Sequence, residues 1–394
     1  MKVLVIHNKY LSKYIGGEDL VYIEELDVLR SKLGFDNVVF YEVSNDTLSW
    51  IDLFKLSYQI WFSWNHYHKI KNLIRERDIK IVHVHNYFPI LTPSIFKAAK
   101  ECGCKVIHTL HNYRLWCIAG TFFRNDYGIC EICTRKRFPL AGFFNKCYRN
   151  SYFHSLVAQL AFSFYRLSKQ FEYIDYFFVL TNFQLQKVKY LGIEESKIKL
   201  KPNGVRYHLV DEILQSKINP TSKMDYIFVG RLEESKGILQ LLHTWEKLNQ
   251  RFILHIVGDG PLGTILREKY KNLNNIIFHG KQDRKSTLKK IFTSKYLICP
   301  SIWYETFGLV IIESMLLKTP VIGFSIGTRT EFIKHEFNGF LCDLASLELI
   351  LETSFDYPYY AEMCENCRKF GEQYFLENII EDQIDFYKKI LGEY

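Results

Sequence analysis

The feature that most constrains the fold of this chain is an alternation of short apolar runs with stretches of helical character. Apolar runs typical of buried strands occur at residues 3–7, 37–42, 79–85, 105–110, 176–180 and 198–200. The stretch 18–32, between the first two runs, carries Val21, Leu26 and Leu29 as apolar residues of a predicted helix. Strands separated by helices predict a mainly parallel sheet with helices on both faces.

The same alternation restarts in the second half of the chain. Further strand-like runs occur at residues 226–230, 252–257, 276–279, 296–299 and 320–323, with helices predicted at 238–249 and from near 309 to before 320. A chain of 394 residues is too long for one ordinary hydrophobic core. We therefore predict an α/β fold of two doubly wound, Rossmann-like domains that face a central cleft.

This pattern also gives expected domain boundaries. Residues 1–205 would form the first domain, with a cysteine-containing insertion at about 115–150. Residues 206–371 would form the second, and the stretch 207–223 looks like the link between them because it contains Pro220. The tail 372–394 is amphipathic and is predicted to be a helix that crosses back to the first domain.

Composition favours a cytoplasmic globular protein. The chain is 48% hydrophobic and 24% charged, and it has no uncharged apolar run of about 18 residues that could span a membrane. The first residues are too short for the apolar region of a signal peptide and fit a buried strand instead. Ten cysteines without such a signal indicate a reducing compartment.

The distribution of charge separates the two halves. Residues 1–205 contain 28 Lys and Arg against 18 Asp and Glu, whereas residues 206–394 contain 23 against 25. The first half shows no RNA-binding or helix-turn-helix signature, so we expect no nucleic-acid partner. Its aromatic stretches at 50–74 and 143–171 fit buried helices that cover the sheet, the favoured interpretation, or partial insertion at an anionic membrane surface. The second interpretation would place the protein peripherally on the inner face of the plasma membrane.

The richest motif lies between residues 301 and 313, where a strand-like run gives way to a helix. Glu305 and Glu313 are eight residues apart, a little over two helical turns, so both carboxylates could lie on one side of the element. Between them Phe307, Gly308 and Leu309 would present backbone N–H groups at a helix N-terminus, which favours anionic or polar oxygen ligands. Such an arrangement suits a polyhydroxylated ligand that carries phosphate.

Other strands of the second half also end in loops with ligand-binding character. Arg231 directly follows one strand and Lys236 lies five residues on, so the two cations could converge on a diphosphate, or simply solvate the surface. Gly258 and Lys281 follow two further strands, where they could admit a flat base against the backbone. A tight turn explains either of these two loops equally well.

The first half offers fewer candidates. Gly17 ends a loop between the first strand and the first helix, where it could let the backbone approach a ligand, although a plain turn is as good an explanation. His111 follows a strand end and would point into the predicted cleft. His83 and His85 share one face of their strand, but no third ligand is evident, so we interpret them as packing or rim residues.

Four cysteines follow His111, at positions 117, 130, 133 and 147. Four thiolates at Cys117, Cys130, Cys133 and Cys147 could close a tetrahedral, structural zinc site. Unbound thiols and disulfides are the alternatives, since two of the intervals run to about a dozen residues. Cys364 and Cys367 fall in a helical stretch and are predicted to pack in the core.

Taken in chain order, these motifs resemble those of the retaining glycosyltransferases of family 4, which have the GT-B fold. The resemblance covers nearly the whole chain and is strongest over residues 200–345. Glu-x7-Glu alone would be a weak signal, whereas the full order is specific. It consists of Gly16-Gly17, His111, the stretch 202–205 with Asn203, Gly230-Arg231 with Lys236-Gly237, the stretch 257–260, and Glu305 with Glu313.

The resemblance implies a role for each matching position. Arg231 and Lys236 would hold the donor diphosphate, and Glu313 would bind the ribose hydroxyls. Glu305 would orient the donor sugar together with the amides of Phe307, Gly308 and Leu309. The donor-binding set would also include Gly17, near the phosphates, with Asn203, Gly258 and Lys281. His111 would contact the sugar or the acceptor from the first domain.

The resemblance further implies an activity. It predicts transfer of a hexose, with retention, from a UDP- or GDP-sugar to a polysaccharide or lipid-linked glycan acceptor during synthesis of a cell-surface polysaccharide such as O-antigen or capsule. No metal would be required for catalysis, and the cysteine insertion lies outside the minimal family pattern. Two alternatives remain: a nucleotide-sugar epimerase of GT-B fold, and a catalytically silent subunit that binds nucleotide.

Overall fold

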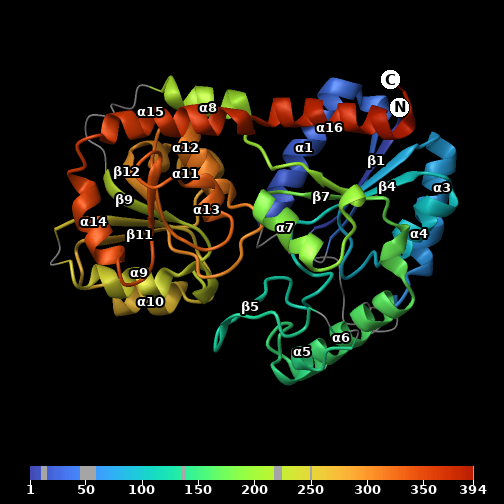
Figure 1. Cartoon of the computed structure of the whole chain (residues 1–394), viewed down its shortest axis with the longest axis horizontal. Helices are drawn as coiled ribbons and strands as arrows, with labels where there is room; N and C mark the ends of the chain where they lie inside the picture. The colour runs from blue at the N-terminus through green and yellow to red at the C-terminus, as the bar shows by residue number, and fades with distance from the viewer. Residues whose placement is uncertain are drawn as a thin grey trace. The chain divides into compact units, whose positions relative to one another are not determined.

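The computed structural model describes residues 1–9, 16–44, 59–134, 136, 138–216, 224–248 and 251–393 (Figure 1). The chain divides into two compact units. Unit 1 comprises Met1–Phe122, Glu131–Asn203 and Leu376–Tyr394, and unit 2 comprises Phe123–Cys130 and Gly204–Phe375. Each unit has its own parallel sheet, as the alternation in the sequence predicts.

The sheet of unit 1 has six strands in the order β2-β1-β3-β4-β7-β8, and its neighbouring strands pair in parallel. Its chain order reverses direction between β1 and β3, which are neighbours in the sheet. The strands are β1 (Val3–Lys9), β2 (Val38–Ser44), β3 (Ile81–Asn86), β4 (Lys105–Thr109), β7 (Tyr176–Val179) and β8 (Ile198–Leu200).

Helices of unit 1 cover this sheet, and local sequence sets several of their starts. The Ser151 side chain caps α6 by accepting from the His154 N–H, and Thr181 caps α7 by accepting from the Gln184 N–H. The helices are α1 (Gly17–Leu33), α3 (Trp64–Arg77), α4 (Ser94–Glu101), α5 (Ala141–Phe144), α6 (Tyr152–Leu167), α7 (Asn182–Tyr190) and α16 (Leu376–Leu391).

The sheet of unit 2 also has six parallel strands, in the order β11-β10-β9-β12-β13-β14. Here the chain order reverses direction between the neighbours β9 and β12. The strands are β9 (Met224–Val229), β10 (Leu254–Val257), β11 (Ile276–Gly280), β12 (Ser294–Cys299), β13 (Val321–Phe324) and β14 (Gly339–Cys342). The sequence analysis did not predict β14.

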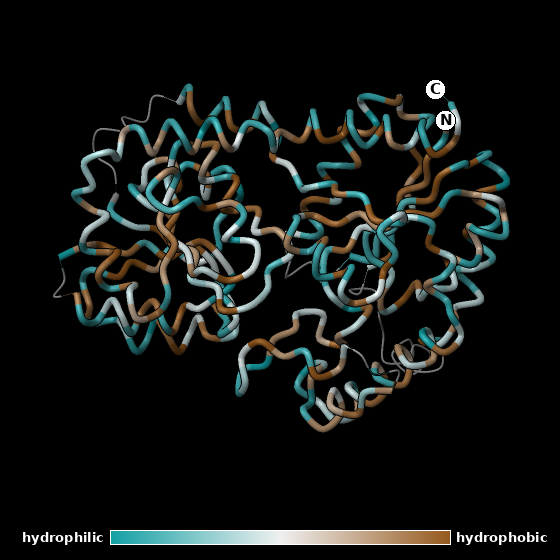
Figure 2. The backbone as a smooth tube through the Cα atoms, viewed as in Figure 1, coloured by the Kyte–Doolittle hydropathy of each residue, from teal (hydrophilic) through white to brown (hydrophobic). Residues whose placement is uncertain are grey.

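The helices of unit 2 surround a core that contains Tyr226, Trp245, Tyr296 and Ile322. They are α8 (Tyr207–Leu214), α9 (Ile238–Trp245), α10 (Gly263–Lys269), α11 (Arg284–Phe292), α12 (Leu309–Leu316), α13 (Arg329–Phe332), α14 (Leu347–Phe355) and α15 (Tyr360–Gly371). The strands of both units appear as the most hydrophobic parts of the backbone in Figure 2, as expected for sheets buried on both faces.

The last helix, α16, belongs to unit 1 although it follows unit 2 in sequence. It packs against α1, and Leu376, Ile380 and Tyr387 join a core that also holds Val5 of β1 and Tyr22 of α1. Helix α16 is therefore an integral part of the first unit.

One expectation about the chain's organisation is wrong. Part of the predicted link 207–223 is the regular helix α8, which belongs to unit 2 and packs against α11. The burial of Val210 and Ile213 on one face explains why this stretch is helical. The rest of the predicted link from residue 217, the end of the predicted helix 238–249 and residues 50–58 of the first aromatic stretch lie outside the described residues.

The segment after His111 combines small elements with an aromatic helix. Strands β5 (Phe123–Arg124) and β6 (Gly128–Ile129) form a short antiparallel ribbon that groups with unit 2. Helix α6 is apolar on two faces: Ala161, Phe162 and Tyr165 are buried, whereas Phe153 and Leu167 are exposed. No helix within the described ranges is long and apolar enough to cross a membrane.

Candidate functional site

The loop between β12 and α12 holds Glu305 beside Lys236, which lies in the segment after β9. Glu305 is buried, and its Oε1 lies 2.6 Å from Nζ of Lys236 and 2.8 Å from the Ser301 hydroxyl that donates to it. Lys236 follows β9 and Glu305 follows β12. The pair therefore lies beyond the carboxyl ends of the two strands at which the chain order reverses, the place where open α/β sheets bind ligands.

The electrostatics of this pair fix both charges. Burial by itself would raise the pKa of Glu305, but the ammonium of Lys236 and the guanidinium of Arg329 outweigh it and lower that pKa to about 2. Burial would lower the pKa of Lys236, and Glu305 raises it instead. Both side chains are ionised at neutral pH. Nζ of Lys236 also lies 5.2 Å from the centroid of the Trp303 ring.

Helix α12 begins at a glycine that the site requires. Gly308 has φ of 86°, in the left-handed region, and a Cβ atom there would lie 2.9 Å from Oε2 of Glu305. Phe307, directly before it, is buried against Phe332 with ring centroids 5.1 Å apart, so the start of the helix is anchored in the core of unit 2. Leu309 is the first residue of α12.

Glu313 occupies the second turn of α12 and pairs with a different cation. Its Oε1 lies 2.8 Å from Nη2 and 3.0 Å from Nε of Arg284, at the start of α11. Both the carboxylate and the guanidinium are largely buried. The sequence thus anticipated two acidic residues in this element, and the structure gives each of them a cationic partner of its own.

The other strand-end loops of unit 2 pack closely upon one another. A Cβ at Gly258, whose φ is 136°, would lie 1.9 Å from the carbonyl oxygen of Gly230. Arg231 is exposed, with Nε 3.1 Å from Oε2 of Glu233. Lys281, after β11, is exposed as well. The loops carrying Arg231, Lys236, Gly258 and Lys281 therefore all lie at the same edge of one sheet.

Three of the predicted catalytic and donor-binding residues belong to unit 1. Gly17 is the first residue of α1, and a Cβ there would meet nothing within 4 Å. Asn203, the last residue of the segment Glu131–Asn203, is buried. His111 follows β4, and its Nε2 lies 2.9 Å from Nδ1 of His85.

The structure distributes the four predicted zinc ligands over both units. Cys117, Cys133 and Cys147 belong to unit 1, and Cys130 groups with unit 2. All four are partly buried, and none of the ten cysteines, which all lie in the described part of the chain, forms a disulfide. In unit 1 the sulfur atoms of the three cysteines do not all lie within 4.8 Å of one another. Cys364 and Cys367 are buried in α15, which confirms their predicted packing role.

Comparison with protein families decides what kind of protein this is. A model described as Glycosyltransferase Family 4 matches residues 39–208, and one described as Glycosyl transferases group 1 matches residues 210–372. The chain belongs to the family 4 glycosyltransferases. The two matches adjoin near residue 209, close to the division between units 1 and 2, and the two parallel sheets have the arrangement of the GT-B fold.

Individual relatives agree with this assignment. The chain is 31% identical over 215 residues to an uncharacterized glycosyltransferase of Methanocaldococcus jannaschii, covering 49% of this chain and 54% of that protein. It is 26% identical over 201 residues to the UDP-Gal:alpha-D-GlcNAc-diphosphoundecaprenol alpha-1,3-galactosyltransferase of Escherichia coli, covering 46% and 51%. The chain thus spans about half the length of these curated relatives.

A solved structure shows the same fold over the full length. The crystal structure of HepE from Anabaena in complex with UDP matches with a TM-score of 0.67 and 15% identity, over 99% of this chain and all of that one. At this identity the likeness concerns the fold alone. It confirms the GT-B architecture predicted for the chain.

Two arginines that support the acidic residues of unit 2 were not predicted from the sequence. Arg284 holds Glu313, and Arg329, completely buried, donates from Nη2 to the carbonyl oxygen of Ser301 at 2.5 Å and from Nε to that of Phe324 at 3.0 Å. Arg329 thus fastens the loop that carries Glu305. Its position, 24 residues after Glu305, gives no signal of this contact, because the contact arises only when β13 returns the chain beside β12.

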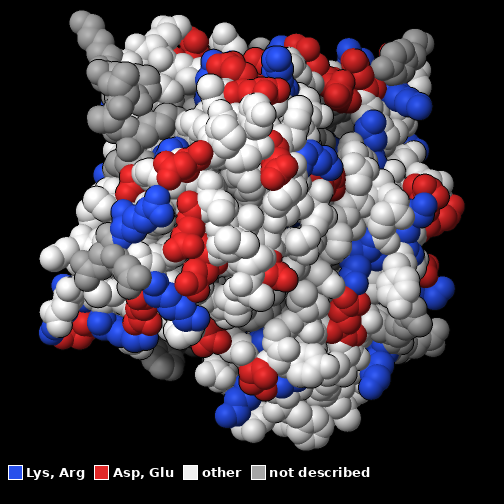
Figure 3. Space-filling view, turned by 60° about the vertical axis from the view of Figure 1, so that its left-hand side comes forward, with Lys and Arg blue, Asp and Glu red and all other residues white. Residues whose placement is uncertain are grey.

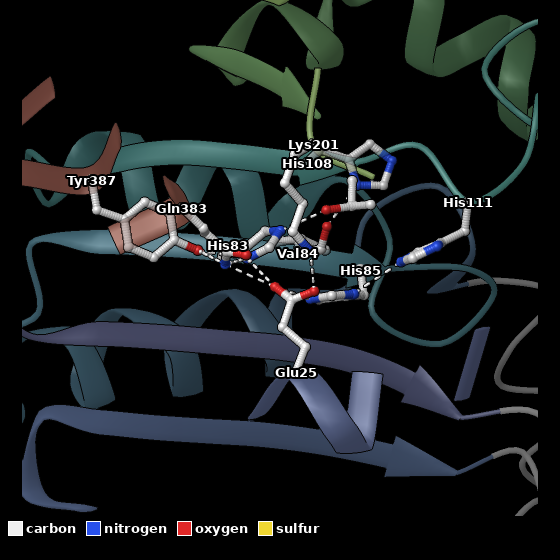
Figure 4. Close-up of polar contacts among 10 residues, drawn as sticks. Glu25, His83, Val84, His85, His108, His111, Lys201, Gln383 and Tyr387 are labelled. Atoms are coloured by element: carbon white, nitrogen blue, oxygen red, sulfur yellow. Dashed lines mark hydrogen bonds and ion pairs between the residues drawn. The ribbon is translucent and has the colours of Figure 1, made fainter. Parts of the chain in front are cut away.

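A further group that the sequence did not reveal surrounds β3 of unit 1. Among the described residues, the one set of three or more potential metal ligands within 4.8 Å of one another is Glu25, His83 and His85. All three are completely or almost completely buried, in agreement with the packing role predicted for the two histidines. Their partners are shown in Figure 4.

Proposed function

We propose that the protein is a retaining glycosyltransferase that moves a hexose from a nucleoside diphosphate sugar to a polysaccharide or lipid-linked glycan. The observation that carries this proposal is the partly buried ion pair of Lys236 with Glu305 at the reversal point of the unit 2 sheet. An ammonium fixed at that point suits the leaving diphosphate, and the adjacent carboxylate suits hydroxyls or the cationic character that develops on the sugar. The UDP bound to HepE supports a nucleotide ligand of this kind.

The proposed reaction exchanges one bond at the anomeric carbon for another on the same face of the sugar. The bond from that carbon to the phosphate oxygen breaks, and the electron pair leaves with the nucleoside diphosphate. The acceptor hydroxyl forms the new carbon–oxygen bond, and its proton passes to the departing phosphate. Arg231 and Lys236 would stabilise the charge on the phosphate, so no metal and no protein nucleophile is needed. Glu313 would bind the ribose hydroxyls, either in place of its ion pair with Arg284 or while keeping that ion pair.

Substitution of Glu305 tests this assignment. In Glu305→Gln we expect transfer to fall roughly 100-fold while the affinity for nucleoside diphosphate, measured by calorimetry, stays within a few-fold. In Arg231→Ala we expect that affinity to fall roughly tenfold. Glu352→Gln, the same chemical change at an exposed position of α14, serves as the control and should match the wild type. Loss of nucleotide binding in Glu305→Gln would contradict the division of roles between Glu305 and the two cations.

Product analysis separates the alternatives. A glycosyltransferase releases nucleoside diphosphate and gives a product whose anomeric configuration, read by NMR, equals that of the donor. An epimerase gives a new nucleotide-sugar without releasing nucleoside diphosphate, and a silent subunit gives neither product. UDP- and GDP-sugars should be compared as donors, because the proposal includes both bases.

The acceptor is proposed to be lipid-linked on the strength of one relative. The Escherichia coli relative is named for an acceptor on diphosphoundecaprenol. A lipid-linked acceptor would lie at a membrane surface, and helix α6 offers a matching face: Phe153 is 66% and Leu167 61% exposed. Phe164 of α6 packs edge to face with Trp61, and Trp64 is exposed nearby in sequence. Tryptophans with exposed aromatic and aliphatic groups are typical of membrane interfaces.

Charge favours an anionic membrane as the partner of α6. Lys146 and Arg149 lie between α5 and α6, and Nζ of Lys146 is 4.5 Å from the centroid of the Tyr152 ring. We expect the protein to float with vesicles that contain anionic lipid and not with neutral vesicles. The double variant Phe153→Ser/Leu167→Ser should stay in solution, whereas Phe35→Ser, which removes an equally exposed ring outside α6, should float. Equal flotation of both variants would refute an α6 membrane contact.

The zinc interpretation of Cys117, Cys130, Cys133 and Cys147 stays a prediction. Metal analysis of protein purified without chelator is the direct test. About one zinc per chain, lost in Cys130→Ser, would support it. A zinc and iron content near zero would contradict the zinc interpretation.

A further inference from the structure

A network of buried polar side chains in unit 1 joins His83 and His85 of β3 to residues of α1 and α16, and it reaches His111 after β4 (Figure 4). At its centre is Glu25 of α1, which is completely buried. Its Oε2 accepts from the Lys201 ammonium and its Oε1 accepts from Nε2 of Gln383 at 2.8 Å. Burial alone would raise the pKa of Glu25, but Lys201, together with His85 and His83, outweighs it and holds that pKa well below the usual range. Glu25 is therefore a fixed negative charge inside the unit.

His83 takes part in this network but is held at both ring nitrogens by other groups. Its Nε2 lies 2.7 Å from Oγ1 of Thr109, and its Nδ1 lies 2.7 Å from the hydroxyl of Tyr387. The amide nitrogen of Gln383 stands 2.6 Å from that hydroxyl and 3.4 Å from Nδ1 of His83. This nitrogen thus occupies the space in which a metal between Glu25 and His83 would sit. The geometry favours an ordered hydrogen-bond network over a metal site.

His85 connects the fixed charge to His111. Its Nε2 lies 3.5 Å from Oε1 of Glu25, and its Nδ1 lies 2.9 Å from Nε2 of His111. The two rings are stacked, with centroids 5.1 Å apart. Burial lowers the pKa of both histidines, so both rings are neutral at physiological pH and each carries one proton.

The position of one proton determines the position of the next. A carboxylate favours a proton on the ring nitrogen that faces it, which is Nε2 of His85. Nδ1 of His85 is then an acceptor. The 2.9 Å contact with His111 can then be a hydrogen bond only if Nε2 of His111 donates.

We propose that Glu25 and His85 are positioning residues that set the tautomer of His111, with its proton on Nε2 and the lone pair on Nδ1. In this state Nδ1 of His111 can only accept a hydrogen bond, so a ligand at that nitrogen must donate, as a hydroxyl of a sugar or glycan does and a bare phosphate oxygen does not. This consequence for ligand choice rests on the proposed function of His111. The tautomer itself does not depend on that function.

The proton positions are measurable without substrate. We would record long-range proton–nitrogen spectra of protein labelled with ¹⁵N at histidine, assigning His111 by the loss of its signals in His111→Asn. We expect the proton on Nε2 of His111, with a coupling across the hydrogen bond to Nδ1 of His85. A proton on Nδ1 of His85 would overturn the proposal.

Removal of the Glu25 charge tests whether that charge sets the tautomer of His111. Glu25→Gln/Lys201→Met removes both members of the buried ion pair together, which avoids a stranded charge. We expect the fraction of molecules with the proton on Nδ1 of His85 to rise several-fold. Tyr387→Phe removes a hydroxyl from the same network on the His83 branch and should leave the tautomer of His111 unchanged. An unaltered tautomer in the double variant would overturn the role of Glu25, and if that variant does not fold, the wild-type spectra still decide the direction of the bond.

Kinetics then connect the network to transfer. His85→Phe keeps a ring but removes the acceptor, and we expect kcat to fall about tenfold with a smaller change in KM for the donor, in line with the loss of one hydrogen bond. His85→Asn restores an acceptor near Nδ1 and should recover most of the loss. Equal activities of these two variants would argue against an effect through His111. Absence of any transfer in the wild type would contradict the proposed function while leaving the NMR test intact.

Discussion

Glu305 and Lys236 show how single residues define the chemistry of unit 2. A carboxylate and an ammonium 2.6 Å apart in a buried loop keep each other ionised. Arg329 and Ser301 hold the same loop from the other side, so the pair has little freedom to move. A ligand that arrives at this edge of the sheet therefore meets charges that are already in place, which is the condition for electrostatic stabilisation of a leaving group.

The depressed pKa of Glu305 predicts a defined dependence of stability on acid. The ionised carboxylate contributes stability that is fully present above its unfolded pKa, 4.5, and is lost as pH falls toward the folded pKa of about 2. We expect the difference in unfolding free energy between wild type and Glu305→Gln to shrink as pH is lowered from 5 toward 3. Urea unfolding at a series of pH values measures this difference. A difference that stays constant over the range would show that Glu305 is not strongly paired.

Gly308 should be intolerant of any side chain. Gly308→Ala forces a left-handed residue and places a Cβ 2.9 Å from Oε2 of Glu305, so we expect about 1–2 kcal/mol of lost stability together with loss of transfer. Gly192→Ala is the matched control, since φ there is also positive, at 98°, but a Cβ would meet nothing within 4 Å. Thermal unfolding and donor turnover of the two variants separate backbone strain from displacement of Glu305. Normal turnover in Gly308→Ala would contradict the contact.

Among the residues, the sequence pointed to those that follow strand ends. Glu305, Lys236 and Glu313 could be predicted because their spacing is local and matches a known motif order. Arg329 and Glu25 could not, because their contacts join segments that are distant in sequence. A buried charge looks the same in a sequence as one on a solvated surface.

At the level of elements, hydrophobic periodicity predicted most strands and helices, but β14 was missed and α8 was taken for a link. The alternation marked the parallel strands because a sheet covered on both faces needs continuous apolar runs. Strand β14, Gly339–Cys342, was not predicted, although three of its four residues are buried. Helix α8 was taken for a link because Pro220 suggested a break, whereas its apolar face packs in unit 2.

Helix α16 provides a prediction at this scale. Its residue Ile380 is completely buried against α1, so Ile380→Ala should lower the free energy of unfolding of unit 1 by about 2–5 kcal/mol. Asp382→Ala, on the exposed face of the same helix, should change it by no more than about 0.5 kcal/mol. Urea unfolding monitored by hydrogen exchange of unit 1 strands measures the effect. Similar values for the two variants would mean that α16 does not contribute to the unit 1 core.

At the level of the whole molecule, two units with separate cores make a single unfolding temperature a poor description. On one face the molecule shows basic and acidic side chains interspersed (Figure 3). The length of the chain correctly predicted two domains. The amphipathic pattern of the tail also predicted a helix that crosses back to the first domain, and α16 belongs to unit 1, but the sequence did not predict which helix of that unit it would pack against.

Nucleotide binding should therefore protect the two units unequally. We expect a saturating nucleoside diphosphate to slow amide exchange at 230–237 and at the start of α12, both in unit 2, by at least tenfold, because a ligand stabilises the state that binds it by mass action. Strand β2 of unit 1 should change little. Hydrogen-exchange mass spectrometry with and without UDP or GDP gives the result. Protection confined to unit 1 would contradict the assignment of the donor site.

The return of α16 to unit 1 also has a consequence for biosynthesis. During translation, the sheet of unit 1 emerges from the ribosome long before Leu376–Leu391, because all of Gly204–Phe375 must be made in between. Until then the part of the unit 1 core that α16 covers is open, and Glu25 lacks its hydrogen bond from the Gln383 amide. The nascent first unit should therefore be a client of chaperones, whereas unit 2 contains all of its own core by the time Phe375 has been added.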